Sequence, residues 1–247
     1  MTAPALLDRR LVFVLGKGGV GKSTVAAALG MVGARAGKRT LLIEVAAQHH
    51  LSRLFTDAAV GVERDVELAP NLWGLSVEVE AAIEEYLAQQ LKVRPLVELL
   101  VRSRAFHSFA AAAPGLSELV TLGKIWELAT EIEDGRPVWD LLVVDCPATG
   151  HGIAMLEVAG RVEELAATGP IREQSAKIQE VVAHPSATGI AVVARPEELP
   201  VTEAVEAVAA LRERGLPAAL AIMNAVAPRR FAPDEAPALE AALRSAP

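Results

Sequence analysis

The chain has 247 residues, enough for one sizeable domain with a buried core, and 52 % of them are hydrophobic while only 4 % are aromatic. The formal net charge of −7 argues against sequence-independent binding to nucleic acid, which needs an excess of Lys and Arg. A single cysteine excludes an internal disulfide framework and a multi-cysteine metal site.

Short apolar runs alternate along the chain with longer stretches of helical periodicity. The first run, 10–16, is followed by strong helix formers that end at Gly37, a residue type that favours helix C-termini. An amphipathic helix is predicted over 197–215. The remaining apolar runs are 38–45, 71–79, 139–145, 189–194 and 217–224. Strands that are apolar on both faces and alternate with helices predict an α/β fold, with a mostly parallel sheet between two layers of helices.

One interval, about 80–135, breaks this alternation. It shows no strand pattern and reads as several helices, broken at Pro95 and Pro114. We therefore expect a single domain over 1–247 with a helical insertion between two strands. No stretch approaches the roughly 18 apolar residues of a membrane-spanning helix, and the N-terminus is too short and polar for a secretory signal. Stable membrane insertion is not expected, and the expected location is the cytoplasm.

A glycine-rich loop directly follows the first apolar run. Residues 16–23, GKGGVGKS, fit G-x-x-x-x-G-K-[ST] between a predicted strand and a predicted helix, which makes this a three-layer P-loop NTPase fold. Glycines let successive backbone N–H groups turn towards phosphate oxygens, and the start of the helix adds its positive end. We expect Lys22 to reach the β- and γ-phosphates and the Ser23 hydroxyl to hold Mg²⁺. The predicted nucleotide-binding residues of this loop are Gly18, Gly19, Val20, Gly21, Lys22, Ser23 and Thr24.

A second polar segment follows the apolar run 139–145. Asp145 ends that run, the position from which a Walker B-type acid faces Mg²⁺, and we predict Ser23 and Asp145 as the metal residues. Cys146 comes next, and no histidine is placed in sequence to activate it. It is therefore interpreted as a small buried residue, with a nucleophile as the alternative.

Two loops carry a resemblance to a known family. Lys17, the second lysine of GKGGVGKS, resembles the deviant Walker A motif of MinD, ParA, the nitrogenase iron protein and the arsenite-pump ATPase. Residues 145–151, DCPATGH, resemble the DTAPTGH loop of the arsenite-pump and tail-anchored-protein-targeting ATPases, which MinD-like proteins lack. Further likeness at 50–55, 82–87 and 113–128 extends the resemblance over about 10–230. The chain is identified as a member of that ATPase family.

The resemblance implies a dimeric, Mg²⁺-dependent ATPase that works as a molecular switch, with ATP as its substrate. Lys17 would reach the nucleotide of the partner, a second copy or a paralogue, and would be catalytic together with Lys22 and Asp145; the alternative is a solvated loop lysine. Asn224 falls where the family reads adenine, which suits an amide that donates and accepts. His151 is a candidate sensor of the nucleotide state, with simple structural hydrogen bonding as the alternative.

The sequence also departs from this family. Ala46 stands where the family has the aspartate that orients the attacking water, and Glu44, Gln48 and His49 are the nearby candidates to replace it. This departure favours one alternative, a nucleotide-binding regulator with little or no turnover. Another alternative is a MinD/ParA-like positioning ATPase, but the acidic balance and the Ala-rich C-terminal segment argue against the DNA-binding face or membrane helix that it needs. The zinc-binding cysteine pair of the eukaryotic targeting factors and the metalloid-binding cysteines of the arsenite pump are absent. The resemblance further implies that the chain stops before the family's last strand and adenine loop.

The helical insertion is a candidate binding site for a client protein. Residues 80–130 include many aliphatic side chains together with Phe106, Phe109 and Trp126, and a groove between such helices can take up an apolar segment. The alternative is a plain helical cap whose apolar stripe faces the sheet.

Overall fold

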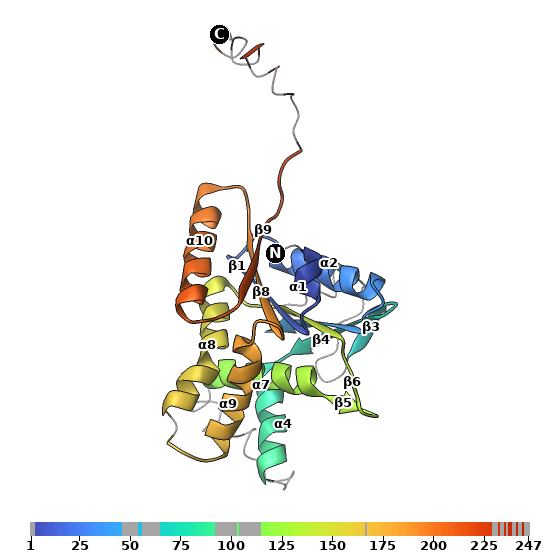
Figure 1. The fold of residues 1–247 in the computed structure, drawn as a ribbon, viewed down its shortest axis with the longest axis vertical. Helices are drawn as coiled ribbons and strands as arrows, with labels where there is room; N and C mark the ends of the chain where they lie inside the picture. The colour runs from blue at the N-terminus through green and yellow to red at the C-terminus, as the bar shows by residue number, and fades with distance from the viewer. Residues whose placement is uncertain are drawn as a thin grey trace.

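The computed structural model describes residues 3–45, 54–55, 65–91, 103, 115–165 and 167–228, with isolated positions after 228. A seven-stranded sheet runs through the middle of the molecule, in the order β3-β4-β2-β7-β1-β8-β9 (Figure 1). All neighbouring strands are parallel except β3 and β4. The strands are β1 Leu11–Gly16, β2 Thr40–Val45, β3 Val66–Ala69, β4 Leu72–Val77, β7 Leu141–Asp145, β8 Thr188–Ala194 and β9 Ala218–Met223. The predicted α/β class and the six predicted strands are confirmed.

Helices cover both faces of this sheet (Figure 1). Among the described residues, α1 Ala3–Leu7 and α2 Lys22–Arg35 lie on one face, and five helices lie on the other. These five are α4 Val79–Leu91, α7 Leu116–Thr130, α8 Thr149–Leu165, α9 Pro170–Ala183 and α10 Glu198–Glu213. Side chains alternate along each strand, so β1 sends Val12 and Val14 to the α2 face and Phe13 and Leu15 to the other. Burial of each such side chain contributes about 1.5–3 kcal/mol, so both faces anchor β1 firmly.

Helix α2 ends where the sequence predicts. Gly37 adopts a φ of 83° and its N–H donates to the carbonyl of Ala34 at 3.0 Å, while the N–H of Lys38 donates to Gly33 at 3.2 Å. This pair of bonds is a Schellman motif, in which a left-handed residue satisfies the last carbonyls of the helix. The motif turns the chain sharply towards β2.

The interval predicted as a helical insertion contains α4 and α7, while Pro95 and Pro114 lie outside the described residues. The prediction that it holds no strand is wrong. Its end forms a short hairpin of β5 Ile132–Glu133 and β6 Arg136–Pro137. Asp134 and Gly135 have φ values of 51° and 75°, the two-residue turn that suits a hairpin. Asp-Gly was the sequence signal for it.

Strand β3 was also missed. It is a four-residue edge strand, antiparallel to β4, and its side chains are half-buried or exposed. The chain reverses between the two strands at Asn71, which has a φ of 63°. A short, half-polar strand lacks the continuous apolar run that identified the central strands. Within the described residues, no helix is long and apolar enough to cross a lipid bilayer.

Candidate functional site

The carboxyl ends of β1, β2 and β7 open into a cavity of about 440 Å³. From β1 the chain continues into α2 on one face of the sheet, and from its neighbour β7 it continues into α8 on the other. In parallel α/β sheets, ligands bind in the crevice that such opposite connections leave. Of the predicted residues, those that line the cavity are Gly18, Gly19, Gly21, Lys22, Ser23, Thr24 and Asp145.

The glycine-rich loop presents its backbone to this cavity. Gly18 and Gly19 are exposed, and a side chain added at either would meet open space. Gly21, which precedes α2, has a φ of 88°, and a Cβ there would lie 2.3 Å from Nδ2 of Asn224. Only glycine fits such a position. Val20 is 2 % exposed and packs below the loop, so its side chain anchors the loop and only its backbone can serve a ligand.

Lys22 begins α2 and bends back over the loop. Its ammonium group donates a hydrogen bond to the carbonyl oxygen of Lys17 at 3.2 Å. The positive end of α2 points at the same place, so an anion in the cavity meets a lysine and a helix N-terminus together. Ser23 and Thr24 follow on the first turn of this helix.

Lys17 does not line the cavity. Its ammonium group lies 2.6 Å from Oε1 of Glu203, on α10 of the same chain. Sequence reasoning did not identify Glu203, because 186 residues separate it from Lys17 and it belongs to no motif. Only the placement of α10 beside the loop reveals this partner.

Asn224 follows β9 and contacts the loop from the side. Its Nδ2 donates to the backbone carbonyl of Val20 at 2.8 Å. One amide proton is thus used to hold the loop, and the amide has a second N–H and a carbonyl oxygen as well. Its predicted role towards adenine stays a prediction.

Two carboxylates lie side by side at the floor of the cavity. Asp145 and Glu44 are register partners on β7 and β2, and they are 5 % and 1 % exposed. Together with the Ser23 hydroxyl they give the cavity hard oxygen donors, which suit Mg²⁺. Sequence reasoning offered Glu44 only as a replacement for the missing aspartate, whereas here it is a neighbour of Asp145. Ala46, Gln48 and His49 lie outside the described residues.

Cys146 is 3 % exposed and its thiol donates to the carbonyl of Val144 at 3.7 Å. Burial, with the nearby charge of Asp145, raises the pKa of this thiol far above its usual range. A thiol that stays protonated is a poor nucleophile, so the interpretation as a buried structural residue agrees with the geometry.

His151 lies in the first turn of α8, with its side chain 80 % exposed. Its Nδ1 is 4.0 Å from Oε1 of Glu118, near the start of α7. This contact connects the loop after β7 with the predicted insertion. Its role as a sensor stays a prediction.

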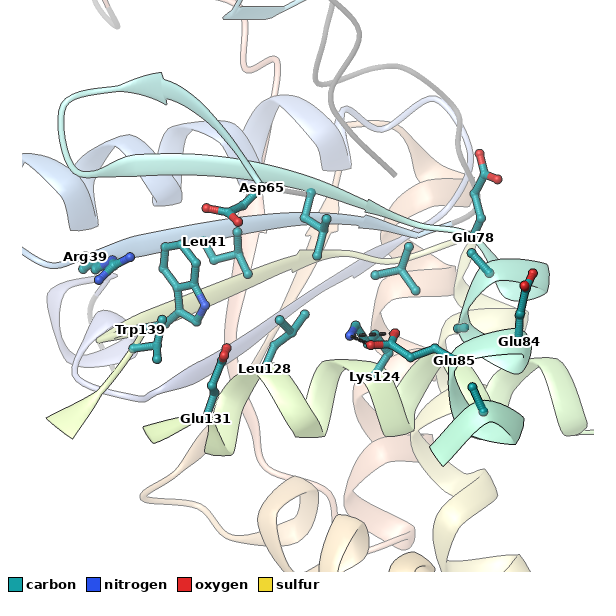
Figure 2. A pocket seen from close by; sticks show the side chains of 16 residues that line it. Arg39, Leu41, Asp65, Glu78, Glu84, Glu85, Lys124, Leu128, Glu131 and Trp139 are labelled. Carbon is teal, nitrogen blue, oxygen red and sulfur yellow. Dashed lines mark hydrogen bonds and ion pairs between the residues drawn. The ribbon is translucent and has the colours of Figure 1, made fainter. Parts of the chain in front are cut away.

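A larger cavity of about 540 Å³ lies between the sheet and the helices α4 and α7 (Figure 2). At one end the Arg39 guanidinium lies over Trp73 and Trp139, 5.2 and 4.8 Å from the ring centroids. At the other end Lys124 points towards Glu85 and binds it at 2.7 Å. Burial alone lowers the pKa of Lys124, but the hydrogen bonds and charges of its neighbouring glutamates raise it more. The lysine therefore stays charged and ties α7 to α4.

A third cavity, of about 300 Å³, is more apolar and lies among α4, α7 and α9. Leu119, Trp126 and Ile178 contribute to its walls, together with Tyr86. Trp126 is therefore placed at an apolar hollow of the predicted insertion, whereas Phe106 and Phe109 lie outside the described residues.

The sequence is similar to several known proteins. A family profile described as anion-transporting ATPase matches residues 9–169. A Mycobacterium tuberculosis protein called ATPase BagA is 33 % identical over 231 residues, which cover 92 % of this chain and 68 % of that protein. The arsenical pump-driving ATPase of Acidiphilium multivorum is 26 % identical, with 91 % of this chain and 41 % of that protein covered. ATPase GET3 of Podospora anserina is 25 % identical, with 66 % and 48 % covered.

Proposed function

This chain belongs to the anion-transporting ATPase family, and from that premise we propose that it is a Mg²⁺-dependent ATPase switch that a second subunit completes. Family membership supports ATP binding and hydrolysis in general. The Mg²⁺ requirement, the dimer and the roles of individual residues are our proposals.

The observation that carries the proposal is the composition of the 440 Å³ cavity. A bare glycine backbone, the ammonium group of Lys22 and the start of α2 meet there, opposite a hydroxyl and two buried carboxylates. The first set suits a polyphosphate and the second suits a hard divalent cation. A cavity that binds only one of the two would not need both sets.

In the proposed mechanism, the backbone amides of 18–24 and Lys22 bind and orient the phosphates of ATP. Ser23 and Asp145 would hold Mg²⁺, with Glu44 beside them, and the metal would supply neutralisation of the phosphate charge when bound. The loop amides and Lys22 would contribute positioning and electrostatic stabilisation. Asn224 contacts both the loop and, in this proposal, the adenine.

Lys17 is proposed to act in the partner subunit, a second copy or a paralogue. A cation supplied in trans to a phosphoryl-transfer transition state can be worth about 10³–10⁵ in rate. Its side chain lies outside the cavity of its own chain, which supports a role towards a neighbour.

The predicted insertion is proposed to take up an apolar client segment. The apolar cavity among α4, α7 and α9 supports this second role, because helix-in-groove recognition needs such a hollow. The His151–Glu118 contact offers a physical connection between the nucleotide loop and this region. The alternative of a regulator with little turnover rests on Ala46, whose side chain lacks the carboxylate that orients the attacking water in the family.

The test compares ATP binding with ATP turnover. We expect Lys22→Ala to lose the calorimetric heat of Mg-ATP binding, because the phosphates lose the ammonium group that the loop offers them in this proposal. We expect Lys17→Ala to keep that heat but to hydrolyse at least about tenfold more slowly. Lys177→Ala, an exposed lysine of α9, is the control and should behave as wild type.

Two results would overturn the proposal. Absence of a binding heat in the folded wild-type chain would show that the cavity does not bind nucleotide. Turnover of Lys17→Ala at the wild-type rate would show that Lys17 does not act on the partner's nucleotide. Tight binding with a single slow turnover in the wild type would favour the regulator.

A further inference from the structure

We infer that Glu203 is a positioning residue that holds Lys17 inside its own subunit, so that Lys17 reaches a partner's nucleotide only after this ion pair opens. The inference rests on the proposed function, because it needs Lys17 to act in trans. Glu203 would then oppose pairing of the subunits and raise the protein concentration needed for ATPase activity, an effect that we call the brake.

The contact is short and reversible. Nζ of Lys17 and Oε1 of Glu203 are 2.6 Å apart, within the range of a charge-assisted hydrogen bond. The two side chains are 38 % and 32 % exposed, so water screens the pair and lowers its strength. A partly exposed pair of this kind holds the lysine in place, but it is weak enough for the lysine to exchange the carboxylate for a competing anion.

The position of Glu203 is fixed by packing. Strand β8 lies next to β1, and α10 follows β8 and packs against it. Ala207 and Leu211 of α10 are 3 % and 0 % exposed and belong to the core. The carboxylate therefore stands on a rigid helix, and it is the loop lysine that must leave when the pair opens.

Both lysines of the loop are occupied within the chain. Lys22 donates to the backbone carbonyl of Lys17, whose own ammonium group binds Glu203. A polyphosphate in the cavity competes for Lys22, and a phosphate of the partner competes for Lys17. Each exchange replaces a contact within the chain by a contact to nucleotide, so nucleotide binding and pairing of subunits favour the same rearrangement.

The size of the brake follows from the exposure of the pair. Exposed ion pairs change an equilibrium about two- to fivefold. When two copies pair, both ion pairs open, so removal of the negative charge should move the concentration for half-maximal activity by the square of that factor, about four- to twenty-fivefold. The maximal rate should stay unchanged, because in this proposal Glu203 no longer contacts Lys17 once Lys17 has reached the partner's nucleotide.

The experiment measures ATPase activity of the full chain against protein concentration, at saturating Mg-ATP. We expect Glu203→Gln to reach half-maximal activity at about four- to twenty-fivefold lower protein concentration, with the same maximal rate. Glu203→Asp keeps the charge and should return towards wild type. Glu206→Gln changes an exposed glutamate of the same helix and should have no effect. In the Lys17→Ala background, Glu203→Gln should change nothing.

A second measurement, light scattering with Mg-ATP, follows dimer formation directly and should show the same shift for Glu203→Gln. A wild-type concentration profile in Glu203→Gln, with Lys17→Ala inactive, would overturn the brake and leave the proposed function intact. A lower maximal rate in Glu203→Gln would also overturn it, since Glu203 would then assist the engaged lysine. Full turnover in Lys17→Ala would overturn the proposed function and this inference together.

Discussion

At the scale of single residues, the loop depends on a few close contacts made by residues far apart in sequence. Asn224 holds the carbonyl of Val20 at 2.8 Å and leaves no room for a side chain at Gly21. Lys17 is held by Glu203 at 2.6 Å. The loop is therefore braced from both β9 and α10 before any ligand arrives.

The first glycine of the motif gives a prediction about stability that does not depend on nucleotide. A Cβ at Gly16 would lie 2.5 Å from the backbone carbonyl oxygen of Val193, whereas a Cβ at Gly18 would meet nothing within 4 Å. We expect Gly16→Ala to destabilise the fold by about 1–3 kcal/mol, because a backbone group of the central sheet must shift. Gly18→Ala should stay within about 0.5 kcal/mol of wild type.

Urea unfolding of the two variants provides the measurement. Equal midpoints for Gly16→Ala and Gly18→Ala would contradict the close approach of Val193 on β8 to Gly16.

At the scale of helices and strands, α4 and α7 are linked by charge across the edge of the 540 Å³ cavity. Lys124 binds Glu85 of α4 and Glu127 of its own helix, at 2.7 and 3.3 Å. The pair with Glu85 matters more for the fold, since it connects two helices, α4 and α7, that are far apart in the sequence. Helix α7 also contacts α8 and α9, so it touches α4 on one side and the helix that follows β7 on another.

Replacement of Lys124 by Met should remove this link while keeping the apolar stem. We expect a loss of a few tenths to about 1 kcal/mol near pH 8, measured by urea unfolding, with exposed Lys177→Met as the control. Because the pKa of Lys124 is raised in the folded state above its ordinary value of 10.5, its stabilisation is fully present below that pH. It is lost as the pH rises through the higher folded value. The difference between variant and wild type should shrink only above about pH 10.5; a difference that shrinks near neutral pH would contradict the assignment.

At the scale of the whole molecule, the proposed site lies at the carboxyl edge of the sheet, and Lys17 is paired with Glu203 of α10 outside the cavity. One chain carries the proposed phosphate-binding and metal-binding groups in this cavity, but its second lysine does not line it. A second subunit is the proposed source of the missing cation.

This arrangement predicts a mass that depends on nucleotide. The chain of 26.0 kDa should shift towards twice that mass in light scattering when Mg-ATP is present, because nucleotide joins the two subunits. Lys22→Ala should stay at the lower mass under the same conditions. An identical mass for the wild type with and without Mg-ATP would argue against nucleotide-dependent pairing.

The sequence by itself determined the strands of the sheet core and the loop. Apolar runs such as 139–145 and the pattern GKGGVGKS are local signals. A strand buried on both faces needs consecutive apolar residues, and a phosphate-binding loop needs closely spaced glycines. The family resemblance drawn from Lys17 and from the segment 145–151 was likewise borne out by the comparisons. The short edge strand β3 and the hairpin β5–β6 were missed, because strands of two to four residues give only a weak periodic signal.

Only the tertiary structure decided which distant groups meet the loop. Nothing near Lys17 in sequence indicates Glu203, and nothing near Glu44 indicates that it stands opposite Asp145. These contacts depend on the order β2-β7-β1-β8, which brings segments far apart in the chain to one edge. Strand order is fixed by packing between the two helical layers, and a local pattern does not encode it.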